Sequence, residues 1–151
     1  MRKISVQAED FDAGAELAAL TALSAGAGGV ASFIGVVRGE VEGKPLAALR
    51  LEHYPGMTEK ALTRLAEAAE ARWVLSGCCI IHRVGRLTPG QNIVLVAAAS
   101  RHRAASLEAT AFLIDQLKTN APFWKAEEFA DGSTHWVAAR ESDEAAAKGW
   151  N

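Results

Sequence analysis

The chain has 151 residues, of which 50% are apolar and 23% are charged. This length suits one domain with its own core, and the composition excludes an intrinsically disordered chain. The formal net charge of −2 gives no bulk attraction to nucleic acid or to an anionic membrane, so any basic site has to be a local cluster.

Periodicity and turn residues divide the chain into alternating strands and helices. The predicted strands are Lys3–Ala8, Val30–Val37, Leu46–Tyr54, Cys78–Val84, Ile93–Ala99, Pro122–Phe129 and Thr134–Ala138. The predicted helices run from a cap at Asp12 to about Ser24, from Thr58 to about Trp73, and from about His102 to Lys118. We therefore expect one α+β domain over residues 1–140, and a polar, alanine-rich tail over 141–151 that becomes ordered on contact with another surface.

The segment Leu17–Val37 contains no charged residue and is long enough to raise the question of a membrane span. It is rich in small residues, and Gly26, Gly28 and Gly29 interrupt it, which favours a helix, a turn and a buried strand. The basic N-terminus could begin a signal peptide, but acidic residues follow where its apolar core should be. We expect a cytoplasmic protein that does not bind a membrane.

The two cysteines, Cys78 and Cys79, are adjacent in an apolar run. Neighbouring side chains on a strand point to opposite faces, so a disulfide between them is sterically awkward. We interpret them as buried thiols in a reducing compartment. A role in handling sulfur is the alternative.

Lys118 is the first candidate for chemistry. At about 100° per residue, Leu107, Ala111, Ile114 and Lys118 fall on one stripe of the third helix. Burying an ammonium group in such a stripe is unfavourable unless it is paired or neutralised. Either Lys118 reaches solvent at the last turn and complements the helix dipole, or it is partly desolvated and acts as an acid, base or nucleophile.

Lys125 is the second candidate. Alternation along the strand places Phe123, Lys125, Glu127 and Phe129 on one face. Lys125 and Glu127 are then either a surface ion pair of little energetic value or a proton-transfer pair near Lys118.

Basic residues form a possible anion site. Arg101–Arg103 follow a predicted strand and open a helix, whose free N–H groups and dipole favour an anion such as phosphate. Arg38, at the end of the strand Val30–Val37, is another candidate, and His82 and Arg83 add positive charge. A solvated basic face is the alternative.

The spacing of two candidates restricts how they can cooperate. Arg103 and Lys118 lie 15 residues apart on one predicted helix, so about 22 Å separates their backbones at about 1.5 Å per residue. One small-molecule site cannot readily use both from a single chain. They serve different sites, or a homodimer brings the Arg103 end of one subunit to the Lys118 end of the other; we favour the homodimer.

Motifs for metals and nucleotides are not apparent. His53 and His135 lack ligand spacing, and the sequence contains no phosphate-binding glycine loop of a nucleotide enzyme. We expect no metal and no cofactor.

Several blocks occur in an order that is typical of one known family. They are Phe33–Arg38, Leu51–Tyr54 with Met57, Ile81–Gly85, Ser100–Arg103, Leu117-Lys118, and Pro122–Glu127 with Asp131-Gly132. Over about residues 1–140 the chain resembles the large-subunit family of molybdopterin synthase. The lysine followed by Pro-x-Trp-Lys-x-Glu is the most specific block.

The resemblance implies an α/β hammerhead-type domain with an additional antiparallel β-hairpin or sheet subdomain. It implies a homodimer with a small ubiquitin-like sulfur-carrier subunit at each end, which together make a heterotetramer. The implied sulfurtransferase passes sulfur from the carrier's Gly-Gly thiocarboxylate to cyclic pyranopterin monophosphate. The product is the dithiolene of molybdopterin, an intermediate in molybdenum cofactor biosynthesis.

The resemblance also assigns residues. Lys118 and Lys125 are implied to be the catalytic pair. The substrate-binding residues, shared across the dimer, are implied to be Val36, Val37, Arg38, His102, Arg103, Lys118, Lys125, Ala126 and Glu127.

Two other functions remain open from the residues. One is a non-catalytic dimeric scaffold that binds a ubiquitin-like tail. The other is an enzyme that acts on a phosphorylated metabolite, with Lys118 as a Schiff-base nucleophile.

Overall fold

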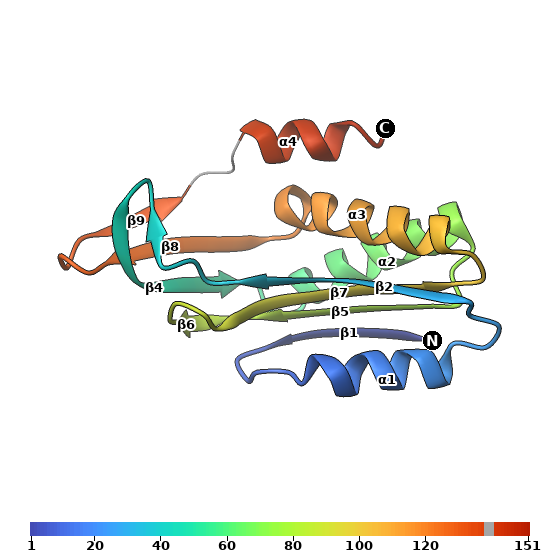
Figure 1. Cartoon of the computed structure of the whole chain (residues 1–151). Helices are drawn as coiled ribbons and strands as arrows, with labels where there is room; N and C mark the ends of the chain where they lie inside the picture. The colour runs from blue at the N-terminus through green and yellow to red at the C-terminus, as the bar shows by residue number, and fades with distance from the viewer. Residues whose placement is uncertain (138–140) are drawn as a thin grey trace.

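Two β-sheets and four helices make up the computed structural model, which describes residues 1–137 and 141–151 (Figure 1). The strands are β1 (Arg2–Gln7), β2 (Gly29–Val36), β3 (Glu40–Val41), β4 (Lys44–His53), β5 (Gly77–Arg83), β6 (Gly85–Leu87), β7 (Asn92–Ser100), β8 (Phe123–Phe129) and β9 (Thr134–Val137). The helices are α1 (Ala13–Leu23), α2 (Met57–Trp73), α3 (Arg103–Asn120) and α4 (Glu141–Lys148).

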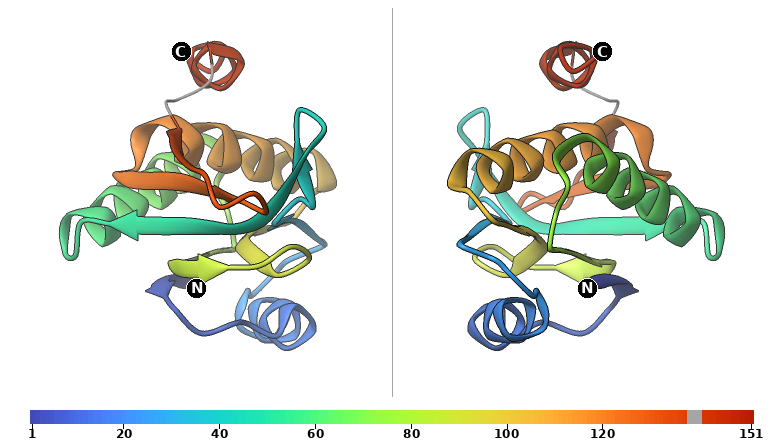
Figure 2. Two further views of the ribbon diagram at one scale, coloured as in Figure 1. Left: turned by 90° about the vertical axis from the view of Figure 1, so that its left-hand side faces the viewer. Right: turned by 90° about the vertical axis from the view of Figure 1, so that its right-hand side faces the viewer.

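The first sheet has four strands in the order β1-β5-β7-β2. Strand β1 is parallel to β5, and the other neighbours are antiparallel. Helices α2 and α3 cover one face and α1 covers the other, as Figures 1 and 2 show from three sides.

The central strands β5 and β7 are buried on both faces, which explains their continuous apolar sequences. Because successive side chains alternate between faces, Cys78 and Ile80 pack with α2 and α3, whereas Cys79 and Ile81 pack with α1. The two cysteines are free and buried, which confirms the interpretation as buried thiols on opposite faces.

The second sheet lies at one end of the first (Figure 1). Its strand order is β3-β4-β8-β9, and β6 also pairs with β4. Strands β4 and β8 are antiparallel, with His53 opposite Phe123 and Leu51 opposite Lys125. A small apolar core supports the sheet and consists of Val37, Leu46, Leu49, Leu51 and Leu87.

The structure confirms an α+β fold and places every predicted strand and helix within a few residues of its expected position. Asp12 caps α1 as predicted, because its side chain accepts a hydrogen bond from the Ala15 N–H at 3.0 Å. Ala138, the last residue of a predicted strand, and Arg140 lie outside the described residues.

The short strands β3 and β6 are not predicted by the sequence. Strand β3 pairs with the start of β4 across a turn in which Glu42 and Gly43 both have positive φ. Glutamate is not a typical residue for such a turn, so the segment reads as a polar loop.

The buried face of α3 differs from the predicted one. Leu107, Ala111 and Lys118 are exposed, and Ile114 is only partly buried. The residues that face the interior are Ser106, Ala109, Thr110, Phe112, Leu113, Gln116 and Leu117. The prediction that Lys118 lies on a buried stripe is therefore wrong. Apolar side chains occur on both sides of this helix, so periodicity alone does not tell which stripe packs on the sheet.

The tail over 141–151 contains α4 (Glu141–Lys148), which packs on α3 of the same chain (Figures 1 and 2). The Gln116 side chain donates a hydrogen bond to the carbonyl oxygen of Ala147 at 2.9 Å. The indole N–H of Trp150 donates to the Asp115 carboxylate at 2.8 Å. The surface that orders the tail is thus its own domain.

Trp150 also packs among aromatic rings of α2 and α3. Its ring meets those of Trp73 and Phe112 edge-on, with centroids 5.6 Å apart in each pair. The Arg72 guanidinium lies over the Trp150 ring and donates to the Trp150 carbonyl oxygen at 2.7 Å. These contacts anchor the end of the chain.

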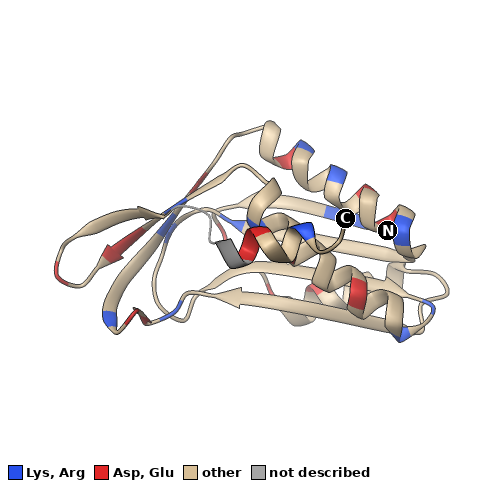
Figure 3. Ribbon diagram, turned by 90° about the horizontal axis from the view of Figure 1, so that it is seen from above, with Lys and Arg blue, Asp and Glu red and all other residues tan. Residues whose placement is uncertain are grey.

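Charges are mixed over the surface that carries α4. Seen from above in Figure 3, basic and acidic residues alternate along the helices and no large face of one sign appears. No helix in the described part of the chain is long and apolar enough to span a membrane.

Candidate active site

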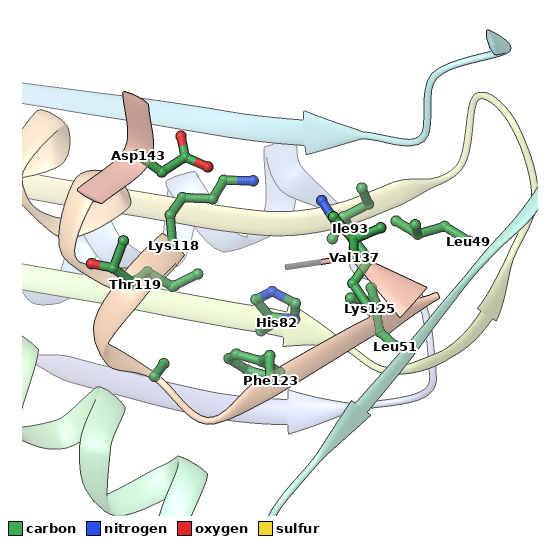
Figure 4. Close-up of a pocket in the computed structure, with 12 residues that line it drawn as sticks. Leu49, Leu51, His82, Ile93, Lys118, Thr119, Phe123, Lys125, Val137 and Asp143 are labelled. Carbon is green, nitrogen blue, oxygen red and sulfur yellow. The ribbon is translucent and has the colours of Figure 1, made fainter. Parts of the chain in front are cut away.

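Lys118 and Lys125 come together where α3 meets β8. Lys118 lies in the last turn of α3, which ends at Asn120, and β8 begins at Phe123. Because this connection is so short, both lysines lie beside the same chain reversal. They line a cavity of about 210 Å³, here called the lysine pocket, and Figure 4 shows both side chains extending into it.

The remaining walls of the lysine pocket come from several elements. His82 of β5 and Phe123 of β8 lie on the opposite side of the cavity from the Lys118 ammonium group, and Asp143 of α4 lies beside Lys118 (Figure 4). Leu49 and Ile93 provide apolar surface. Among the described residues, the pocket thus combines cations, a carboxylate and an imidazole with apolar side chains.

A second cavity of about 320 Å³ adjoins the first and is here called the β2 pocket. Both lysines line it as well. Its lining also includes Arg38, two residues after the end of β2, and Glu127 of β8. Of the residues predicted for the site, the structure brings together Val36, Val37, Arg38, Lys118, Lys125 and Glu127.

Strand alternation explains which residues of β8 reach the cavities. Lys125 and Glu127 are two residues apart and line the β2 pocket together. Ala126 is fully buried and is not among the described residues that line either cavity. The Ala126 side chain is therefore not placed to contact a ligand in either cavity.

His102 and Arg103 lie at the opposite end of α3 from Lys118. His102 is the N-cap residue, Arg103 is the first helical residue, and both are exposed. Neither is among the described residues that line the two cavities. One chain by itself therefore separates the predicted substrate-binding residues into two groups.

His82 and Arg83 do not add positive charge to the site in the way the sequence suggests. Burial lowers the pKa of His82 to about 4, so the imidazole is neutral near pH 7. The Arg83 guanidinium is buried and donates to the carbonyl oxygens of Ala8 and Asn92, at 2.9 Å and 3.1 Å. Arg83 connects loops and strands rather than binding an anion.

His82 lines the lysine pocket as a neutral residue, whereas the sequence suggested it only as a source of positive charge. Every residue of β5 is buried, so alternation of polar and apolar residues gives no indication of which face a side chain occupies. Its position in the Ile81–Gly85 block was the available signal.

The two thiols are poor nucleophiles in this environment. Burial raises the pKa of Cys78 to about 12 and that of Cys79 to about 11, and the thiolate is the reactive form of cysteine. Neither is among the described residues that line the cavities. Over the described ranges, no group of three or more His, Cys, Asp or Glu side chains could hold a metal ion.

Known proteins share this fold and sequence. A model of the MoaE protein family matches residues 6–120. The molybdopterin synthase catalytic subunit of Brucella melitensis is 51% identical over 148 residues, which cover 97% of this chain and 90% of the relative.

Solved structures agree with that match. A molybdopterin biosynthesis MoaE protein from Burkholderia ambifaria superimposes with a TM-score of 0.85 at 47% identity, covering 99% of this chain and 98% of that one. A molybdopterin synthase from Staphylococcus aureus gives a TM-score of 0.83 at 27% identity, covering 91% of this chain and 98% of that one. Because the family match spans most of the sequence, and the Brucella relative is half identical over nearly all of it, the chain belongs to the MoaE protein family.

Proposed function

We propose that this chain is the catalytic subunit of a molybdopterin synthase. It transfers sulfur from the thiocarboxylated C-terminus of a small ubiquitin-like carrier subunit to cyclic pyranopterin monophosphate, and the product is the dithiolene of molybdopterin. The observation that carries the proposal is the meeting of Lys118, Lys125, Arg38 and Glu127 around two adjoining cavities in a member of this family.

The side chains suit this chemistry. A thiocarboxylate tail and a phosphorylated substrate are both anions, so ammonium and guanidinium groups can hold them by charge-assisted hydrogen bonds. Addition and elimination of sulfur require protons to move at the reacting carbon, and positioned lysines can supply or accept them. We assign Lys118 to the thiocarboxylate and the reacting carbon, and Lys125, oriented by Glu127, to the partner acid or base.

The state of the two cysteine thiols bears on where the transferred sulfur comes from. Cys78 and Cys79 are buried and protonated near neutral pH, and neither is among the described residues that line the two cavities. A relay through a protein cysteine has no candidate in this arrangement. That supports a separate carrier that brings activated sulfur on its own C-terminus.

We propose that the chain acts as a homodimer within a heterotetramer. Phe33, Ile34 and Val36 of the edge strand β2 are 38% to 50% exposed, and Leu107 of α3 is 59% exposed. An apolar surface of this kind is typical of a protein–protein contact. A second copy bound there could also bring its His102 and Arg103 to the lysines of the first copy.

We place the protein in the cytoplasm. Free thiols at Cys78 and Cys79 are compatible with a reducing compartment. The proposed partners are a protein carrier, a second copy and a small pterin, with no nucleic acid and no membrane.

Reconstitution tests the proposed activity. The purified protein is combined with a thiocarboxylated carrier and cyclic pyranopterin monophosphate, and molybdopterin is measured for wild type, Lys118→Ala and Lys60→Ala. Loss of a catalytic lysine usually lowers turnover by about 10²-fold or more, whereas Lys60 is exposed on α2 and its loss should leave turnover unchanged.

The same assay separates the alternatives. Carrier binding without molybdopterin formation would indicate a non-catalytic scaffold. Trapping of a carbonyl substrate on Lys118 by borohydride would indicate a Schiff-base enzyme. Wild-type turnover in Lys118→Ala would contradict the assignment of this lysine.

A further inference from the structure

His82 occupies an unusual position for a histidine. It lies near the end of β5, is only 5% exposed, and lines the lysine pocket. Its ring stacks on Phe123 with centroids 3.9 Å apart and an interplanar angle of 20°. Figure 4 shows the imidazole across the cavity from the Lys118 ammonium group. Stacking and burial therefore fix the plane of the ring against the pocket.

The hydrogen bond of the ring fixes its tautomer. His82 Nδ1 lies 2.8 Å from the carbonyl oxygen of Arg83. A carbonyl oxygen only accepts hydrogen bonds, so Nδ1 carries the proton and donates it. In a neutral ring Nε2 is then an acceptor. Nε2 is also the ring nitrogen farther from the strand backbone, at the edge of the ring that reaches toward the cavity.

The surroundings keep the ring neutral. Burial is the main cause that lowers the pKa of His82 to about 4; the hydrogen bond to Arg83 opposes it, and the charge of Lys118 and the neighbouring His53 add to it. Lys125 of β8 and Asp143 of α4 are the other ionisable groups of this pocket. At pH 7 the imidazole is thus an uncharged acceptor near two cations.

An acceptor at this place complements the rest of the lining. The two lysine ammonium groups only donate hydrogen bonds. The Thr119 hydroxyl points away from the cavity, and Asp143 lies beside Lys118 on the opposite side (Figure 4). Among the side chains labelled in Figure 4, His82 is therefore the acceptor on its own side of the cavity. A buried donor left unpaired there would be unfavourable.

We propose that His82 is a substrate-contacting residue of this site, and that its Nε2 accepts a hydrogen bond from an N–H donor bound in the lysine pocket. The inference rests on the proposed function. Two groups of the proposed ligands carry such a donor: a backbone amide of the carrier tail and a ring N–H of the pterin.

Two substitutions distinguish the roles of the two ring nitrogens of His82. The amide of His82→Asn reaches about as far as Nδ1 and can still donate to the Arg83 carbonyl, but it leaves the Nε2 position empty. The longer His82→Gln places an amide oxygen or nitrogen near Nε2 and gives up the bond to Arg83. His135→Asn, an exposed histidine on β9, controls for histidine loss.

Steady-state kinetics give the first readout. We expect kcat/KM to fall roughly 10- to 100-fold in His82→Asn, as for leaving one buried donor unpaired. His82→Gln should recover most of that loss, and His135→Asn should match wild type. A higher KM for the carrier alone assigns the donor to its tail, and a higher KM for the pterin alone assigns it to the ring.

A binding measurement on the wild-type protein tests the same contact even if the His82 variants fold poorly. We expect the ¹⁵N resonance of His82 Nε2 to shift when a carrier with an ordinary C-terminal carboxylate, or the pterin, is added. Wild-type kinetics in His82→Asn, or an unshifted Nε2 resonance with both ligands bound, would overturn the inference. Failure of the proposed function would show separately, as a wild-type protein that forms no molybdopterin.

Discussion

The charge of His82 is set by its burial, which links one side chain to the stability of the whole chain. Its pKa is lowered from 6.5 to about 4 in the folded protein. Between these pH values the unfolded chain binds a proton at this position and the folded chain does not. The free energy of unfolding therefore decreases as the pH falls through this window.

Removal of the imidazole should weaken that pH dependence. The contribution of His82 to the loss between pH 6.5 and pH 4 is at most about 3 kcal/mol, and His82→Gln should not show it. Urea titrations of both proteins at pH 7 and pH 4.5 would measure the difference. Equal pH slopes for the variant and wild type would contradict the neutral, buried state of this histidine.

The sequence predicted some of the individual site residues. Alternation in β8 correctly places Lys125 and Glu127 on one side, because each residue of a strand reverses direction relative to the last. His82 could not be found in this way, since β5 is buried on both faces. Lys118 was found for a wrong reason: its stripe on α3 is exposed, and the helix end rather than a buried face brings it to the pocket.

Secondary-structure elements were predicted best where the pattern is local and strong. The apolar runs of β5 and β7 and the cap of α1 at Asp12 require no knowledge of distant contacts. Strands β3 and β6 have only two and three residues. They form because each pairs with β4. Helix α4 packs on α3, and Trp150 just after it packs on α2 and α3; a polar sequence does not reveal these contacts.

Trp150 should control the order of α4. Its ring packs against Trp73 and Phe112, and its indole N–H donates to Asp115. We expect Trp150→Ala to lower the free energy of unfolding by about 1–3 kcal/mol, less than for a fully buried tryptophan, and to speed amide hydrogen exchange in α4 but not in β7. Trp136→Ala, at a half-exposed position on β9, is the control. Unchanged exchange in α4 would show that the other contacts hold it.

For the whole molecule, the separation of the lysines from Arg103 predicts sharing between subunits. Each end of α3 carries one group of candidate residues, and the exposed apolar residues of β2 offer a surface for a second copy. Only an assembly in which the two ends meet can place both groups on one substrate.

A mixed dimer tests this arrangement. Lys118→Ala and Arg103→Ala chains are co-expressed with different tags, and the dimer that contains one of each is purified. If sites are shared, this dimer keeps one intact site of two and should have about half of wild-type activity, whereas each variant homodimer is nearly inactive.

A matched mixed dimer of Lys118→Ala with Lys125→Ala should stay inactive, because one site then lacks Lys118 and the other lacks Lys125. Restoration in this control, or its absence in the Lys118–Arg103 mixture, would show that the residues do not cooperate across subunits. Sedimentation of each mixture confirms that dimers are present.

The short connection between α3 and β8 restricts where related sequences can gain or lose residues. Only Ala121 and Pro122 separate the helix from the strand, and the strand alternates sides at every residue. Inserting or deleting one residue there would turn Lys125 away from the pocket and replace it with Trp124 or Ala126. Sequence length can drift at the turns near Gly43 and Gly132, which have positive φ and lie in open space. Between Lys118 and Lys125, by contrast, the number of residues has to be preserved together with the lysines themselves.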